Sequence, residues 1–197
     1  GGIPRSLEAL LASPKFVLRV EEDRANAPGG VYRLSDLELA SRLSFFLWKS
    51  IPDDDLLQLA EREQLSKPDV LAQQVRRMLA DERSTRFLND FSGQWLEVRN
   101  ISSQQPALQF QFDPTLRDAM ARETELFFQS QVRDDRPIQD LLRANYTFLN
   151  ERLAQHYGVE GVFGSHFRRV TLTNEDRFGL LGQGSVLVRS PGVAGLP

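Results

Sequence analysis

The chain has no cysteine among its 197 residues. Without thiols it cannot form disulfides, bind zinc through thiolates, hold an iron–sulfur cluster or attach haem covalently through a C-x-x-C-H motif. Histidine is scarce too: His156 and His166 are the two in the chain, and they form no H-x-x-x-H or H-x-H pattern. A histidine-based metal site is therefore not indicated. We expect no cofactor within this chain.

Charge of one sign and long apolar runs are also scarce. The formal net charge is -3, from 24 basic and 27 acidic residues, and no basic stripe is interleaved with aromatic residues. This balance argues against nucleic acid as a partner. No apolar stretch approaches the ~20 residues that a membrane-spanning helix needs, so no membrane span is expected.

The two ends of the sequence indicate a piece of a longer polypeptide. The chain opens Gly-Gly-Ile-Pro without a start methionine, and its last residues are rich in glycine and proline. We expect residues 1–30 to be the end of a preceding domain or an N-terminal helix–strand appendage, and residues 31–165 to be a helical domain. Residues 166–197 are expected to begin a following domain or to form a C-terminal appendage.

Helical patterns dominate the rest of the sequence. They predict a mainly α fold, an irregular multi-helix bundle of about seven or eight helices, with minor β structure near both ends. The helices are expected at residues 3–12, 35–48, 53–64, 66–79, 84–98, 113–133, 137–143 and 150–158, and the strands at 16–20 and 167–172.

Several local signals support these helices. Ser35 and Glu38 have the spacing of a capping box. The helix that follows is apolar nearly all round, which is typical of a helix at the centre of a bundle. Trp48 and Trp95 fall on apolar arcs and are expected in the core. The triple aspartate 53–55 lacks the alternation of a calcium loop and suits a helix N-terminus.

Glu123 stands out because it falls in the middle of the apolar arc of the long helix expected over residues 113–133. A buried carboxylate without a partner costs several kcal/mol. We expect an internal salt bridge, with Arg42 or Arg152 as the counter-ion, or hydrogen bonds to a neighbouring loop. A role as general acid or base is the alternative.

The run YTFLNERLAQHYG, residues 146–158, gathers the other candidates for chemistry around a very short helix. His156 lies near the C-terminal end of that helix, where the dipole favours a protonated imidazole. It is interpreted as a packing and capping residue, with a base or a single metal ligand as the alternative. A catalytic site built here would combine Glu123 and His156 with Tyr146 or Tyr157. His166 is expected in an exposed loop.

Glycines near the C-terminal end match parts of known enzyme motifs, but no motif is complete. Ser185 in Gly182-Gln-Gly-Ser-Val186 lacks the second glycine of a nucleophile elbow, because Leu187 occupies that position. Gly179, Gly182 and Gly184 likewise form neither a G-x-G-x-x-G fingerprint nor a P-loop. We expect these glycines to allow close packing of the backbone.

Six segments of the chain carry a family resemblance: ALLASPKFVLRVE (9–21), YRLSDLELASRLSFFLWKSIPDDDLL (32–57), QVRRMLADERSTRFLNDFSGQWL (74–96), MARETELFF (120–128), YTFLNERLAQHYGV (146–159) and RRVTLTNEDRFGLLGQGSVL (168–187). The first five resemble helical domains of unknown function in large exported proteins of planctomycetes and related bacteria, which are often fused to cytochrome-c-like domains. The last segment resembles the junction with the next domain of such proteins.

The resemblance implies an exported location, in the periplasm or at the cell surface, and other domains of the same polypeptide as partners. It also implies haem c in a neighbouring domain, and it brings no catalytic residues with it. The leading hypothesis is a non-catalytic helical module of a redox-associated protein. A hydrolytic or redox-assisted enzyme domain using Glu123 and His156 is one alternative. The other is a glycan- or surface-binding element, which would need exposed aromatic side chains.

Overall fold

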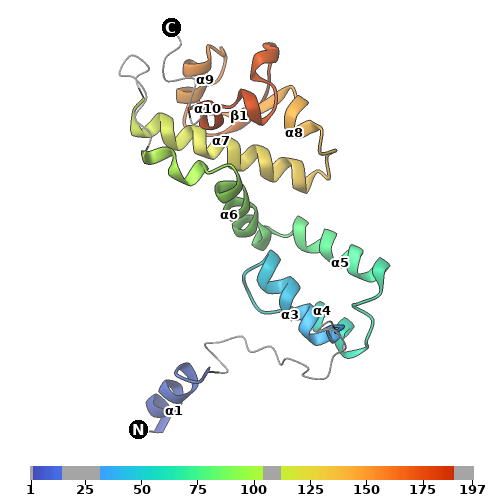
Figure 1. Cartoon of the computed structure of the whole chain (residues 1–197). Helices are drawn as coiled ribbons and strands as arrows, with labels where there is room; N and C mark the ends of the chain where they lie inside the picture. Colours follow the sequence, from blue (N-terminus) through green and yellow to red (C-terminus); the bar gives the residue numbers. More distant parts are fainter. Residues whose placement is uncertain (1, 15–31, 104–111, 189–197) are drawn as a thin grey trace.

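The computed structural model describes residues 2–14, 32–103 and 112–188 (Figure 1). Within these ranges the chain forms nine α-helices, seven of them with seven or more residues, and a small two-stranded sheet. The predicted mainly α fold is therefore confirmed. Of the β structure expected near both ends, the C-terminal part is present, while the strand expected at residues 16–20 lies outside the described residues. Among the described residues, no helix is long and apolar enough to cross a bilayer.

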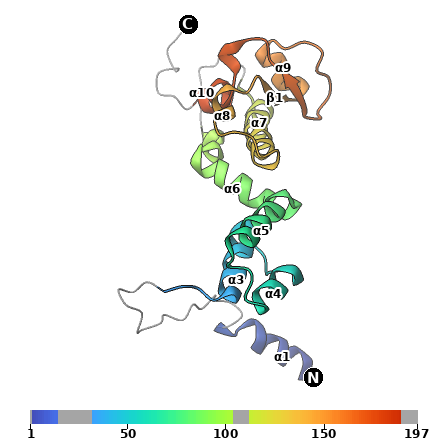
Figure 2. The same cartoon turned by 90° about the vertical axis from the view of Figure 1, so that its right-hand side faces the viewer.

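The first half of the described chain forms a helix, a small lobe and a connecting helix. Helix α1 has its leucines exposed, whereas α3, α4 and α5 pack into what we call the N-terminal lobe. Helix α6 lies between this lobe and helix α7 in both views (Figure 1 and Figure 2). The bounds are α1 Gly2–Leu11, α3 Asp36–Leu47, α4 Asp54–Glu61, α5 Pro68–Ala80, η2 Glu82–Ser84, α6 Thr85–Trp95 and η3 Val98–Ser103.

Local signals in the sequence set the helix starts of this lobe. The Ser35 hydroxyl accepts a hydrogen bond from the Glu38 N–H, and the Glu38 carboxylate accepts one from the Ser35 N–H at 2.7 Å, which confirms the predicted capping box. Asp53 caps α4 by accepting from the Leu56 N–H at 3.1 Å. The triple aspartate thus begins a helix, as expected.

Trp48 is the centre of the N-terminal lobe. Its ring is 2% exposed, and its indole N–H donates to the Met78 carbonyl at 2.9 Å. The Arg83 guanidinium lies 3.4 Å from the ring centroid, and Arg77 pairs with Asp53 at 2.7 Å. This tryptophan therefore joins the end of α3 to the end of α5, and its predicted place in the core is confirmed.

The prediction that the helix after Ser35 is surrounded on all sides is wrong. Ala40 and Ser44 are fully buried against the lobe, but Leu37, Phe45 and Phe46 on other faces of α3 are exposed. The lobe consists of three helices, so a second layer that would cover the remaining faces of α3 is missing from the described residues. An apolar sequence alone does not show whether such a layer exists.

The C-terminal lobe is built on the long helix α7. Its N-cap Asp113 accepts a hydrogen bond from the Leu116 N–H at 2.8 Å. Helix α9 ends at Gly158, whose φ of +68° is the left-handed conformation that glycine adopts readily. The bounds are α7 Pro114–Arg133, α8 Asp140–Arg143, β1 Tyr146–Leu149, α9 Glu151–Tyr157, β2 Arg168–Thr171, η5 Glu175–Arg177, η6 Leu180–Gly182 and α10 Gly184–Leu187.

The two strands form an antiparallel pair in which Tyr146 lies opposite Thr171 and Leu149 opposite Arg168. Strand β2 was predicted, whereas β1, which directly precedes α9, was missed. The domain boundary expected after residue 165 falls between these two paired strands. Helix α10, which follows β2, also packs on α7.

Close backbone packing explains two of the C-terminal glycines. A Cβ on Gly182 would lie 2.4 Å from the Arg177 backbone, and one on Gly179 would lie 2.5 Å from the Leu142 backbone. Gly179 also has a φ of +61°. The expectation that these glycines allow close packing is therefore confirmed, and Gly179 combines a left-handed backbone with a close approach.

The replacement Gly179→Ala tests this close approach. Gly161 is a matched control, since it also has a positive φ, of +80°, but nothing lies within 4 Å of an added Cβ. We expect Gly179→Ala to lower the free energy of unfolding by about 1–3 kcal/mol more than Gly161→Ala, as for an overpacked core. Urea denaturation of both variants measures the difference, and equal losses would contradict the close approach.

Candidate functional site

Glu123 lies in the middle of α7 and is 1% exposed, as its place in the apolar arc predicted. One carboxylate oxygen accepts a hydrogen bond from the Thr147 hydroxyl at 2.6 Å, and the other accepts one from the Tyr157 hydroxyl at 2.7 Å. Thr147 comes from β1 and Tyr157 from the end of α9. A single side chain therefore joins three elements of the C-terminal lobe.

Tyr157 extends this network to the C-terminal end of the lobe. Its hydroxyl oxygen also accepts a hydrogen bond from the Gly184 N–H at 2.7 Å, at the start of α10. The Arg177 guanidinium lies 4.3 Å from the Tyr157 ring centroid and donates to the Gly182 carbonyl at 3.2 Å. The hydroxyl is thus both a donor and an acceptor, and it links the buried carboxylate to a helix start.

Burial dominates the electrostatics of this network. Desolvation raises the pKa of Glu123 to about 7, although the two hydroxyl donors and the positive charge of Arg177 act to lower it. Desolvation and the neighbouring Glu123 carboxylate raise the pKa of Tyr157 well above its ordinary value. Tyr157 therefore keeps its proton and donates, while Glu123 changes protonation near neutral pH.

The counter-ions expected for Glu123 lie elsewhere. Arg152 pairs with Asp113 at 2.7 Å, and Arg42 belongs to α3 in the N-terminal lobe. The predicted salt bridge is therefore wrong, and the hydrogen-bonding alternative is confirmed, with hydroxyl groups from a strand and a helix as the donors. Two hydroxyls suffice here because the carboxyl group can also lower its cost of burial by holding a proton.

The other candidates of residues 146–158 do not meet at Glu123. His156 is half-buried, with its ring centroid 5.7 Å from that of Tyr157. Its pKa is lowered by burial first, and then by the charges of Arg177 and Arg152, so the dipole argument for a protonated imidazole at this site is outweighed.

Tyr146 belongs to a separate buried cluster. Its hydroxyl accepts a hydrogen bond from the Gln131 amide at 2.7 Å and lies 3.1 Å from the Ser130 hydroxyl. The Arg169 guanidinium lies 3.6 Å from its ring. The structure therefore brings Tyr157, but neither Tyr146 nor His156, into hydrogen-bonding contact with Glu123. His166 is exposed, as expected.

Sequence reasoning missed a second set of buried polar groups one residue along α7. The Thr124 hydroxyl donates to the Gln183 side-chain carbonyl at 2.6 Å and lies 2.6 Å from the Ser185 hydroxyl. Thr147 was also missed, because no strand was predicted before α9. The alternation in Tyr146-Thr-Phe-Leu149 was the available signal for that strand.

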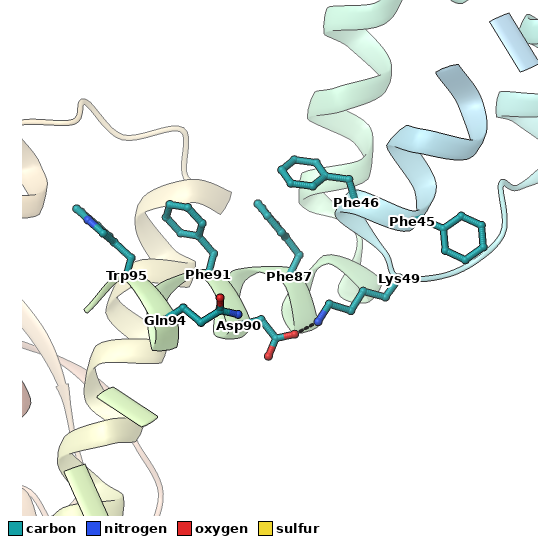
Figure 3. A pocket seen from close by; sticks show the side chains of 8 residues that line it. All are labelled: Phe45, Phe46, Lys49, Phe87, Asp90, Phe91, Gln94 and Trp95. Atoms are coloured by element: carbon teal, nitrogen blue, oxygen red, sulfur yellow. Dashed lines mark ion pairs between the residues drawn. The ribbon is translucent and has the colours of Figure 1, made fainter. Parts of the chain in front are cut away.

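The described residues also form an open groove between α3 and α6, which we call the aromatic groove (Figure 3). It has a volume of about 540 Å³ and a polar rim that includes the ion pair of Lys49 with Asp90. Neighbouring aromatic rings in the groove contact one another. The ring centroids are 4.7 Å apart for Phe46 and Phe87, 6.0 Å for Phe87 and Phe91, and 5.9 Å for Phe91 and Trp95. The groove is lined by Phe45, Phe46, Lys49, Phe87, Asp90, Phe91, Gln94 and Trp95.

The prediction that Trp95 is a core residue is wrong, because 54% of its surface is exposed in this groove. Trp95 lies on the apolar face of α6, as its spacing indicated, but Phe128 of α7 covers its ring only in part. Phe46 at 62% and Phe91 at 46% are exposed beside it. The chain thus has the exposed aromatic side chains that a surface-binding element needs.

The two features differ in what they can do. Glu123 is a titratable group sealed in the lobe, and neither the aromatic groove nor a second hollow along α7 is lined by Glu123, His156, Tyr146 or Tyr157. The groove is accessible, and the charged side chains that line it, Lys49 and Asp90, form an ion pair. Among the described residues, no cluster of His, Asp and Glu side chains is suited to hold a metal ion.

The buried carboxyl group makes stability depend on pH. Between about pH 4.5, the ordinary pKa of a glutamate, and pH 7 the folded chain binds more protons at Glu123 than the unfolded chain does. The stabilisation is complete below this window and is lost as the pH rises through it, by up to about 3 kcal/mol. We expect Glu123→Gln to remove this dependence when urea unfolding is followed from pH 4.5 to 8.

Glu125→Gln is the control, since it removes the same charge from the outer part of α7, where Glu125 pairs with Arg122. This variant should keep the wild-type pH dependence. If Glu123→Gln and the control had the same slope of unfolding free energy against pH, the assignment of the raised pKa to Glu123 would be wrong.

Comparison with known proteins identifies the family. A family model described as "PSD4: Protein of unknown function (DUF1592)" matches residues 34–159. The match covers more than half of the chain, and the chain belongs to this family. It spans α3 to α9, and therefore includes Glu123, Tyr157 and the aromatic groove. No curated protein and no solved structure matches the chain.

Proposed function

We propose that this chain is a non-catalytic helical module of a multidomain, exported, redox-associated protein whose haem c lies in a neighbouring domain. In this role it positions a cytochrome-c-like domain or forms part of a surface that faces the substrate. The observation that carries the non-catalytic part is the closed environment of Glu123. Its two oxygens accept hydrogen bonds from Thr147 and Tyr157 inside the lobe.

An enzyme site would need a reactive group that a substrate can reach. Glu123 is buried, and its hydrogen-bond donors come from β1 and α9, which hold the lobe together. His156 lies beside Tyr157 with a pKa lowered by burial and two arginines. Ser185 is fully buried and hydrogen-bonded to Thr124. These contacts support a structural role for each of the three groups.

The redox link rests on the order of the six segments that resemble exported proteins with cytochrome-c-like domains. The family match supports the helical domain and carries no information on haem or export. Since the chain has no cysteine, covalent haem attachment requires a C-x-x-C-H motif in another part of the polypeptide.

The absorption spectrum of the full-length protein tests this proposal. Purified from the periplasmic or cell-surface fraction, it should show a Soret band that the 197-residue chain, purified alone as a control, lacks. The chain should also keep its buried network without haem. A full-length protein without a Soret band would contradict the redox link, and recovery in the cytoplasmic fraction alone would contradict export.

A further inference from the structure

Helix α6 is held by the C-terminal lobe along its whole length. At its first residue, the Thr85 hydroxyl accepts a hydrogen bond from Arg133 of α7 at 2.7 Å. Further along, Phe91 and Trp95 both contact the ring of Phe128 of α7, with centroids 5.7 and 6.2 Å apart. Because these contacts reach the last residue of α6, we expect α6 and α7 to move as one body.

The N-terminal lobe is a separate body with a core of its own. Its buried apolar residues lie between Ala40 and Met78. The other two clusters of buried apolar residues begin at Ile101 and Phe127. Among the described residues, no buried apolar cluster therefore contains members from both bodies. From α6, Phe87 packs against the edge of the N-terminal core.

The chain passes from one body to the other at Ser84. Arg83 belongs to the N-terminal lobe, since its guanidinium lies 3.4 Å from the centroid of the Trp48 ring, whereas Thr85 is held by α7. Ser84 lies between them and is fully buried, and its hydroxyl donates to the Asp81 carbonyl at 2.8 Å. The backbone of Asp81 is extended, so no continuous helix stiffens this passage. A few residues at the ends of elements, between two packed bodies, are the usual place of a hinge.

Across the aromatic groove, the two bodies meet through a ring contact and an ion pair (Figure 3). The ring centroids of Phe46 and Phe87 are 4.7 Å apart, and Lys49, just after α3, pairs with Asp90 of α6. The space beside these contacts is the hollow of about 540 Å³ itself. The faces of α3 and α6 that line the groove are therefore not packed on each other along their length.

Asp90 has a cation from each body. It pairs with Lys49 of the N-terminal lobe and with Arg99 of η3, which follows α6. The side chains of Lys49 and Asp90 are 45% and 35% exposed, and an ion pair between such groups contributes little to stability and is screened by salt. When Lys49 withdraws into water, Asp90 keeps Arg99, so no carboxylate is left unpaired. The Lys49–Asp90 pair can therefore break and form again at low cost.

We propose that Ser84 is the pivot of a hinge about which the N-terminal lobe swings against α6 and the C-terminal lobe, with the Lys49–Asp90 ion pair as the latch of the aromatic groove. When the latch is released, Phe46 moves away from Phe87 and the groove widens. Helix α5 also contacts α7, and the swing turns about an axis through that contact and Ser84. An occupant that touches both α3 and α6 favours the latched state, because it binds that state more tightly. The hinge is independent of the redox role and the export proposed above.

Distances between pairs of spin labels in the full 197-residue chain test the hinge. The chain has no cysteine, so two introduced cysteines carry the labels. Gln58→Cys on α4 and Ile138→Cys after α7 are exposed positions, one on each body. In double electron–electron resonance we expect this pair to show two distance populations. The population of the released state should grow at about 1 M salt, where the Debye length falls to about 3 Å.

Label pairs inside a single body are the controls. Gln58→Cys with Gln73→Cys joins α4 and α5, and Ile138→Cys with Gln155→Cys joins two points of the C-terminal lobe, all at exposed positions. Each pair should give one narrow distance distribution that salt does not change. Arg86→Cys with Ile138→Cys should be equally narrow, because α6 moves with α7.

The latch is tested by Lys49→Met, which removes the cation of the N-terminal lobe and leaves Arg99 on Asp90. At low salt this variant should give the distribution that the unaltered latch shows at high salt, and salt should then have no further effect. Lys67→Met is the control, since it removes the same charge from an exposed position of the same lobe. It should keep the original distribution and its salt dependence.

The pivot is tested by Ser84→Ala, which removes the hydroxyl that holds the Asp81 carbonyl. The distribution between the two bodies should become broader. Ser92→Ala is the control, because it removes a buried hydroxyl whose hydrogen bond lies within α6, to the Asn89 carbonyl, and it should leave the distribution unchanged. Circular dichroism checks that each variant keeps its helices.

A salt-dependent second distance between the bodies, with narrow distances inside each of them, supports the hinge. A distribution between the bodies that is as narrow as the controls and unaffected by salt and by Lys49→Met contradicts it, because the two bodies then form one rigid unit. Equal effects of Lys49→Met and Lys67→Met contradict the latch. An unchanged distribution in Ser84→Ala, or broadening inside one body, contradicts the pivot.

Discussion

The C-terminal lobe depends on the hydrogen bonds that the Glu123 carboxylate accepts from Thr147 and Tyr157. A carboxylate in an apolar interior is unfavourable unless its oxygens are satisfied, and a hydrogen bond to a charged group contributes about 1.5–3 kcal/mol. Here the donors come from β1 and α9, so the polar group can be satisfied in the assembled lobe and not on the isolated helix α7. Burial of Glu123 therefore favours the one arrangement of α7, β1 and α9 in which both of its oxygens accept hydrogen bonds.

This requirement also explains the chemistry of the lobe. Burial raises the pKa of Glu123 to about 7, a value that in an open cleft would suit a general acid or base. Neither the aromatic groove nor the hollow along α7 is lined by Glu123. The raised pKa follows from packing, and the exposed surface that can bind a partner lies in the other part of the chain, at the aromatic groove.

The sequence predicts the features that depend on neighbours along the chain. The Ser35–Glu38 capping box, the Asp113 cap and the Gly158 helix end involve residues within a few positions of one another, and the burial of Glu123 follows from the periodicity of a single helix. The hydrogen-bond partners of Glu123 cannot be predicted from this periodicity, since Thr147 and Tyr157 lie 24 and 34 residues away in sequence. Trp95 shows a second limit. Periodicity places it on an apolar face but cannot show whether anything covers that face.

The most direct measurement of the central claim is the coupling free energy between Glu123 and Tyr157. A double-mutant cycle of Glu123→Leu and Tyr157→Phe, followed by urea unfolding at pH 8, compares the loss from Tyr157→Phe with and without the carboxylate. The structure predicts a favourable coupling of about 1–3 kcal/mol, as for residues in one hydrogen-bonded network. Additive losses, with a coupling indistinguishable from zero, would show that the carboxylate does not hold these elements together.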